Sequence, residues 1–224
     1  CKGRTIRDGI EDIHGLGLQS MEIQLVRGKA VKELEDFEEL GEIAKSLNIH
    51  MAIHGPYYMD LLGDKKETLL FCSEVLEQID CPKIIDADAI KSIRIKDVSN
   101  SIITANHREL KILIDNSNLI LSKIEDIQPF IGDNILISKG STDIIISKEK
   151  IAYNKTGNPG MTVAGTGDIL AGIIAGFSSQ KNSLFDSSCA GTFLCGKIGD
   201  KLFKKFGNGF LASDFINQIP MILK

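Results

Sequence analysis

In the first part of the chain, apolar residues recur with the spacing of alternating helices and strands. Isoleucines three and four positions apart predict a helix over residues 6–14, which Gly15 ends. Residues 21–26 alternate as a strand, residues 34–47 return to helical spacing, and residues 50–54 predict a second strand. A strand, a helix and a further strand in this order form the unit of a parallel sheet with helical crossovers.

The middle of the chain holds short runs that are rich in isoleucine. After a helix expected over 69–79, buried strands are predicted at 83–85, 101–104, 119–121 and 134–138. Residues 143–147 and 151–154 follow at the spacing of a hairpin, and we expect them to pair.

Three helices are predicted at the C-terminal end. Residues 168–177 are almost entirely apolar, which indicates a helix buried between the sheet and its neighbours. Residues 186–206 and 213–223 are amphipathic and are expected to cover it. The order of elements therefore predicts an α/β fold with a parallel sheet and flanking helices.

Composition narrows the class of protein. The chain has 224 residues, of which 43% are apolar and 25% charged, as in a soluble globular protein of one large or two small domains. The formal net charge of -4 gives no sign of the basic face that nucleic-acid binding requires. No apolar run approaches the roughly eighteen residues of a membrane span, and no leader is evident, so we expect a cytoplasmic protein without membrane contact. The five cysteines are scattered and indicate reduced, mostly buried thiols.

The stretch from Asn158 to Asp168 carries the clearest chemistry. It reads Asn-Pro-Gly-Met-Thr-Val-Ala-Gly-Thr-Gly-Asp and runs directly into the apolar helix. Glycines let backbone N–H groups point outward, and the start of a helix adds unpaired amides and a positive dipole end, so the stretch predicts an anion cradle. Asp168, in the first helical turn, would stay ionised and accept a proton from a hydroxyl beside a cradled phosphate. An ordinary helix cap is the simpler alternative, but it does not explain so long a motif.

Other segments agree with this motif in order and spacing. They are Ile-Ile-Asp-Ala-Asp-Ala at 84–89, Ile-Thr-Ala-Asn-His-Arg-Glu at 103–109, a Lys-Gly hairpin at 136–145, and the segment 209–220. With the stretch at 158–168 they make the chain from about Lys66 to Lys224 resemble the NAD(P)H-hydrate dehydratases of the ribokinase-like superfamily. The resemblance implies a ribokinase-like sheet with flanking helices and an enzyme of nicotinamide nucleotide repair.

The resemblance also implies a reaction and its site. ADP or ATP, with Mg²⁺, would phosphorylate the hydroxyl of NAD(P)H hydrate, and the loss of phosphate would re-form the double bond, so the enzyme would be a carbon–oxygen lyase. Asp168 would be the catalytic base and would contact the substrate together with Asn106, which stands where the family commonly has histidine. We expect no metal site formed by the protein alone. The residues expected to bind the nucleotide are Lys139, Gly140, Ser141, Thr142, Asp143, Gly165, Thr166 and Gly167.

Residues 1–65 differ in character and resemble a fragment of an endonuclease IV-type TIM barrel. His54 would correspond to a zinc ligand of that family and Tyr57 to a residue of its DNA-facing loop. A single histidine makes no zinc centre, so a structural role for His54 is favoured. We therefore expect two units, a barrel fragment over 1–65 and the C-terminal part of a dehydratase domain over 66–224.

The chain begins with Cys1 and not with Met, which indicates a natural start further upstream. The glycine-rich first half of a dehydratase domain is also missing, so we expect impaired turnover unless a partner completes the cleft.

Alternatives remain at this point. The same cradle and acid would serve a small-molecule kinase of the ribokinase-like superfamily, and residues 1–65 would suit a zinc-dependent endonuclease IV-like nuclease or sugar-phosphate isomerase. The chain could also be a truncated or chimaeric product without activity of its own. It could form a homo-oligomer, which the sequence does not decide.

Asp86 and Asp88 would either cap the next helix or enter the ligand cleft, and Asp88 is expected beside the site. Three glycines in the helix 186–206 indicate close packing on the preceding helix or on the nucleotide, at Gly191, Gly196 and Gly199.

Overall fold

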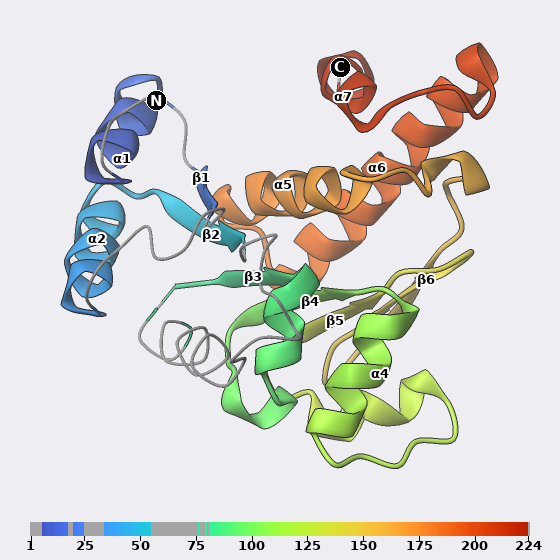
Figure 1. Cartoon of the computed structure of the whole chain (residues 1–224), viewed down its shortest axis with the longest axis horizontal. Coiled ribbons are helices and arrows are strands. Elements are labelled where there is room, and N and C mark those ends of the chain that lie inside the picture. The colour runs from blue at the N-terminus through green and yellow to red at the C-terminus, as the bar shows by residue number, and fades with distance from the viewer. Residues whose placement is uncertain are drawn as a thin grey trace, which may run out of the picture.

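A computed structural model of the chain describes residues 6–17, 20–24, 34–54, 76, 79 and 81–223. Towards the N-terminus, helices and strands alternate as α1 (Ile6–Gly15), β1 (Ser20–Gln24), α2 (Leu34–Ser46) and β2 (His50–His54). β1 and β2 pair in parallel, and β2 lies against β3 (Lys83–Asp86) (Figure 1). The predicted strand–helix–strand unit is therefore confirmed.

A mixed sheet of five strands forms the centre of the fold, in the order β3-β4-β5-β6-β7. Its further strands are β4 (Ser101–Ala105), β5 (Ile135–Ser138), β6 (Asp143–Ile146) and β7 (Ile151–Asn154). β3, β4 and β5 run parallel, whereas β5, β6 and β7 pair antiparallel, with Ile144 opposite Tyr153 in the predicted hairpin. The carboxyl ends of the three parallel strands thus meet at one edge of the sheet.

Helices cover both faces of this sheet, as the α/β prediction requires (Figure 1). One face packs on α4 (His107–Asn116) and on the 3₁₀ helices η1 (Ala87–Ser92), η2 (Ile95–Asp97) and η3 (Ile124–Phe130). The other packs on α5 (Thr166–Ser179), α6 (Leu184–Phe206) and α7 (Ala212–Ile216). Alternation along the strands divides the two cores: Ile103 and Leu136 face α4, while Ile102 faces α5 and α6. The apolar helix predicted over 168–177 is confirmed as α5.

Two predicted elements are wrong. Residues 119–121 are not a strand, because β4 pairs directly with β5 and Asn118, at a φ of +53°, turns the chain at the end of α4. Ile120 is fully exposed in the resulting loop. The single helix predicted over 213–223 is divided into α7 and α8 (Ile219–Ile222), because Pro220 has no N–H and its ring would clash with a helical carbonyl one turn earlier.

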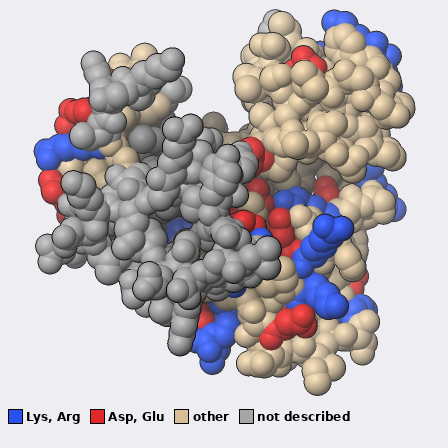
Figure 2. All heavy atoms as spheres, in the orientation of Figure 1, with Lys and Arg blue, Asp and Glu red and all other residues tan. Residues whose placement is uncertain are grey.

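Some predictions lie outside the described residues: Tyr57, the side chain of His54, the boundary near residue 65 and most of the helix expected over 69–79. On the described part of the face in Figure 2, acidic and basic side chains are interspersed rather than separated by sign. None of the helices that the structure describes combines the length and the apolar character needed to span a membrane.

Candidate functional site

A cavity of about 810 Å³ lies where the parallel strands end. Its lining comes from the residues after β3, β4 and β5, from the loop before α5, and from the first turn of α5 and the middle of α6. The predicted site residues that line it are Asn106, Lys139, Gly140, Ser141, Asp143, Gly165, Thr166, Gly167 and Asp168. Thr142, described in the same turn as Gly140, does not line the cavity. The fold thereby brings predicted site residues that lie up to 62 positions apart in the sequence, from Asn106 to Asp168, to one cavity.

The start of α5 lines the other side of the cavity with backbone atoms, because Gly165 and Gly167 have no side chains. Gly165 caps the helix at a φ of +91°, a conformation that favours glycine, and a Cβ there would lie 3.0 Å from the Cβ of Ala212. A Cβ on Gly167 would lie 3.4 Å from Asp86 Oδ2 and 3.7 Å from Lys139 Nζ. A side chain at 167 would therefore narrow the space between α5 and the charged residues after β3 and β5.

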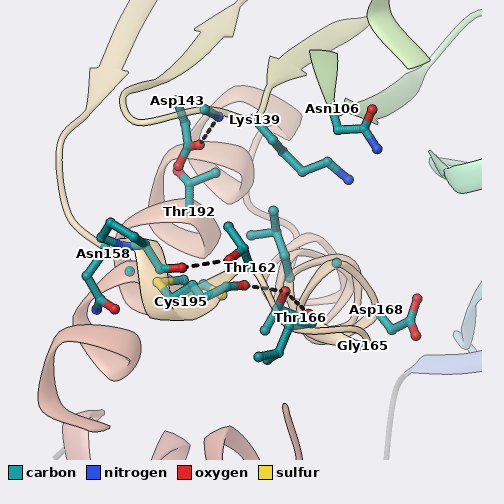
Figure 3. A pocket seen from close by; sticks show the side chains of 18 of the residues that line it. Asn106, Lys139, Asp143, Asn158, Thr162, Gly165, Thr166, Asp168, Thr192 and Cys195 are labelled. Atoms are coloured by element: carbon teal, nitrogen blue, oxygen red, sulfur yellow. Dashed lines mark hydrogen bonds between the residues drawn. The ribbon is translucent and has the colours of Figure 1, made fainter. Parts of the chain in front are cut away.

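The hydroxyl of Thr166 shapes the turn that precedes these amides. Thr166 Oγ1 donates towards the carbonyl oxygens of Met161 at 2.8 Å and Val163 at 2.9 Å (Figure 3). Thr166 N–H itself donates to the carbonyl oxygen of Val163 at 3.4 Å. Helices in general leave N–H groups of the first turn without carbonyl partners one turn below, but an anion cradle at this turn stays a prediction.

Lys139 is held between two carboxylates. Its Nζ donates to Asp86 Oδ1 at 2.8 Å and lies 3.8 Å from Glu109 Oε2. Asp86 Oδ1 also accepts a hydrogen bond of 2.6 Å from Thr104 Oγ1. These side chains come from the ends of β3, β4 and β5 and the first turn of α4, so the cation is placed by four separate elements.

Asn106 has a structural role that the sequence did not reveal. It caps α4: its Oδ1 accepts hydrogen bonds from the N–H groups of Arg108 at 2.9 Å and Glu109 at 3.0 Å, while Glu109 Oε2 accepts from Asn106 N–H at 2.8 Å. Because the oxygen is engaged in the cap, only the Nδ2 group of Asn106 remains to donate to a ligand. Glu109 is shared between this cap and Lys139.

Asp143 is half-buried in the opposite part of the cavity. Its carboxylate accepts from Gly140 N–H at 3.0 Å and from Asn154 Nδ2 at 3.0 Å, and burial raises its pKa despite these bonds and the nearby Lys139. Beside it, burial and then the charge of Asp143 raise the pKa of Cys195 to about 12. Cys195 is therefore a neutral, inert thiol in the cavity wall.

Asp168 stands at the other end of this arrangement. In Figure 3 its half-buried side chain leaves the first turn of α5 and points away from Asp143. Asn106 and Lys139 project from the strand side between these two carboxylates. An elongated ligand can therefore touch the glycine turn along its length and still reach Asp168.

Asp86, Glu109, Thr192 and Cys195 line the cavity but were not predicted as site residues. Of the two alternatives for Asp86, entry into the ligand cleft fits the structure: Asp86 lines the cavity, and its side chain makes no capping hydrogen bond to η1. Asp88 forms an ion pair with Lys91 and is not among the lining residues, so its place beside the site stays a prediction. The signal was available, because Asp86 is the last residue of the strand and Asp88 lies a half-turn into η1.

The glycines of α6 pack closely, as predicted, but on different partners. A Cβ at Gly191 would lie 2.4 Å from Ile174 Cγ1 of α5, which confirms the expected contact with the preceding helix. Gly196 and Gly199 contact Thr156 and Met161 of the loop before α5 instead, with corresponding distances of 2.1 Å and 2.3 Å.

Comparisons with known proteins agree with this site. The family model described as NAD(P)H-hydrate dehydratase matches residues 60–221. The bifunctional NAD(P)H-hydrate repair enzyme Nnr of Methanocaldococcus jannaschii is 36% identical over 186 residues, which are 82% of this chain and 35% of that protein. The ADP-dependent (S)-NAD(P)H-hydrate dehydratase of Natrialba magadii is 30% identical over 153 residues, 67% of this chain and 57% of that protein.

Solved structures show the same fold. A ribokinase-like superfamily protein of Enterococcus faecalis superposes with a TM-score of 0.67 at 24% identity, covering 96% of this chain and 79% of its own. The ADP/ATP-dependent NAD(P)H-hydrate dehydratase of Bacillus subtilis gives 0.65 at 17% identity, covering 94% and 90%. The predicted ribokinase-like fold is therefore confirmed.

The extent of the matches bears on the first part of the chain. Residues 66–224 are 159 of the 224 residues, or about 71%, so a match over 82% of the chain reaches into residues 1–65. A separate endonuclease IV-like unit there stays a prediction. The chain spans about a third of the length of the Methanocaldococcus relative. With most of its length matched by the family model, the chain belongs to the NAD(P)H-hydrate dehydratase family.

Proposed function

We propose that the chain catalyses the dehydration of NAD(P)H hydrate with ADP or ATP as the phosphoryl donor. One observation carries this proposal: the glycine turn that leads into Asp168 and the cation of Lys139 line the same cavity. The name of the Natrialba relative, an ADP-dependent NAD(P)H-hydrate dehydratase, supports the same reaction.

The reaction needs a base and a better leaving group. Asp168 is proposed to take the proton from the ring hydroxyl as the hydroxyl oxygen bonds to the transferred phosphorus. The nucleotide supplies the phosphoryl group, which leaves with the former hydroxyl oxygen as inorganic phosphate, whereas hydroxide alone leaves poorly. As the phosphate leaves, the neighbouring ring carbon loses a proton to solvent and the double bond re-forms, so one ADP becomes AMP and phosphate, with release of a proton, for each nicotinamide restored.

The electrostatics of the cavity explain why several donors are needed for the nucleotide. Among the lining residues that the structure describes, four carboxylates stand against one lysine, so the formal charge of these groups is −3; the carboxylates are Asp86, Glu109, Asp143 and Asp168. A polyphosphate would be repelled unless it lies against the α5 amides and Lys139, where the helix dipole also favours an anion.

Magnesium fits this charge pattern. Among the residues that the structure describes, no group of three or more His, Cys, Asp or Glu side chains is placed to hold a metal ion. Mg²⁺ is commonly bound by one or two carboxylates together with substrate phosphates, and Asp86 and Glu109 supply oxygen ligands of that kind beside Lys139. It would neutralise charge on the phosphates.

Asn106 is proposed to orient the substrate. Its Oδ1 is engaged in the cap of α4, so its contribution would be a single hydrogen bond donated by Nδ2 to a hydroxyl or phosphate. Such a donor carries no charge, in contrast to the protonated histidine that would otherwise be suited to this place.

The test is the incubation of hydrated NADH with ADP, Mg²⁺ and the chain. We expect reduced nicotinamide, AMP and phosphate to appear in equal amounts, with no reaction when the nucleotide is omitted. A phosphorylated alcohol that persists would support a small-molecule kinase instead. Absence of both turnover and AMP binding would refute the proposal.

A further inference from the structure

One wall of the cavity is a loop that is tied to the side of α6. Thr156, Gly157, Asn158 and Met161 line the cavity, and the loop continues into the glycine turn of α5. Across from it, Asp200 accepts two hydrogen bonds from this loop: Gly157 N–H to Oδ2 at 3.2 Å and Asn158 Nδ2 to Oδ1 at 3.1 Å. Both oxygens of a half-buried carboxylate are thus used to hold the loop.

The loop is also shaped from within. Asn158 Oδ1 accepts from Gly160 N–H at 3.0 Å, so the amide of Asn158 links Asp200 to the turn of η4 (Pro159–Met161). Gly157 has a φ of +107°, a conformation that favours glycine, and in this conformation its N–H donates to Asp200. These hydrogen bonds are directional, so they fix the orientation of the Asn158 amide and of the Gly157 and Gly160 N–H groups. The contact with Asp200 therefore helps to define the conformation of the loop.

The surface of α6 next to Asp200 packs closely on the loop. Gly196 and Gly199 are buried, and a Cβ on Gly196 would lie 2.7 Å from the backbone carbon of Thr156. These glycines precede Asp200 by four and one positions; the backbone of Thr156 lies on Gly196, and the side chain of Met161 lies on Gly199.

From these contacts we propose that Asp200 is a positioning residue for nucleotide binding, which it supports by holding the Gly157–Asn158 wall of the cavity in place. The inference rests on the proposed function, since it takes an adenine nucleotide as the ligand. Asp200 does not line the cavity and takes no part in proton transfer.

The test exchanges the two partners. In Asp200→Asn the new amide accepts only one hydrogen bond, and its NH₂ group competes with that of Asn158. In Asn158→Asp two carboxylates face each other. In the double variant, the carboxylate at 158 accepts from Gly160 N–H and from the amide at 200, whose oxygen accepts from Gly157 N–H. Every hydrogen bond and the net charge are thereby restored.

Three quantities are measured on the whole chain: AMP affinity by calorimetry, exchange of the Gly157 amide with deuterium, and Tm. Each single variant is expected to bind AMP about tenfold more weakly, as the loss of one or two net hydrogen bonds predicts, and to exchange Gly157 faster. The double variant should recover the slow exchange of Gly157 fully and the AMP affinity in part, because its carboxylate now stands on a residue that lines the cavity. The control is Asp133→Asn, which removes one negative charge from an exposed position, as Asp200→Asn does from a half-buried one. It should have the AMP affinity and the Gly157 exchange of the wild type.

The outcomes separate this inference from the proposed function. If the single variants lower Tm but bind AMP as the wild type does, Asp200 has a structural role alone and the inference is overturned. If the wild type neither binds AMP nor turns over hydrated NADH, the proposed function fails, and Gly157 exchange then tests only whether Asp200 holds the loop: faster exchange that the double variant reverses supports this, and unchanged exchange overturns it.

Discussion

The contact between α6 and the cavity loop can be tested through Gly196. In Gly196→Ala the new Cβ would lie 2.1 Å from Thr156 Oγ1 and 2.7 Å from the Thr156 backbone carbon, closer than real Cβ atoms approach. The hydroxyl can rotate away but the backbone cannot, so we assign a steric cost of about 2 kcal/mol, within the usual range of overpacking. Replacing a helical glycine by alanine returns about 1 kcal/mol. The net loss of stability is about 1 kcal/mol, and Tm should fall by roughly 2–4 °C.

Gly172→Ala is the matched control. Gly172 is an exposed residue in the middle of α5, and no atom lies within 4 Å of its added Cβ. Only the helical gain of about 1 kcal/mol remains, so Tm should rise by roughly 2–4 °C. Thermal unfolding followed by circular dichroism distinguishes the two signs. An increase in Tm for Gly196→Ala equal to that of the control would refute the packing of α6 on the loop.

Three other predictions concern charged and titratable groups in the cavity. Lys139→Ala should weaken AMP binding by tenfold or more in calorimetry, because hydrogen bonds to charged groups contribute about 1.5–3 kcal/mol, and Lys96→Ala should not. Since burial and Asp143 raise the pKa of Cys195 to about 12, iodoacetamide at about pH 8 should leave this thiol unmodified in the folded chain and alkylate it in urea, as peptide mass spectrometry would show. Burial raises the pKa of Asp143 above 3.8, so the folded protein holds that proton more tightly than the unfolded chain and loses this stabilisation as the pH rises. We therefore expect the free energy of unfolding of Asp143→Asn, measured in urea, to rise relative to that of the wild type as the pH increases above about 4. A difference between the two proteins that does not change with pH would contradict the raised pKa.

The regular elements were predictable where local pattern and long-range packing agree. The strands β5 to β7 and the helices α5 and α6 carry apolar patterns that their burial explains; β5, for example, is buried on both faces of the sheet. Residues 119–121 show where this fails: Leu119 and Leu121 pack on the core from a loop, so their apolar character reports burial without reporting a strand. The strand order β3-β4-β5-β6-β7 depends on pairing between distant segments, which periodicity does not contain.

The site divides in a similar way. The glycine turn before Asp168 is a local motif and was predicted from a single stretch of sequence. The ion pair of Asp86 with Lys139 joins residues 53 positions apart, and the hydrogen bonds of Asp200 to the cavity loop span 42 and 43 positions. Such contacts follow from the way strand ends and α6 meet in space, and the residue types alone do not indicate them.

The most direct measurement of the central proposal is the rate at which Asp168→Asn restores reduced nicotinamide from hydrated NADH with ADP, followed by near-ultraviolet absorbance. Loss of the general base should lower this rate by about 10²–10⁴-fold while AMP still binds, and Asp88→Asn, whose carboxylate lies outside the cavity lining, should keep the wild-type rate. An Asp168→Asn variant as fast as the wild type would show that this carboxylate does not activate the hydroxyl.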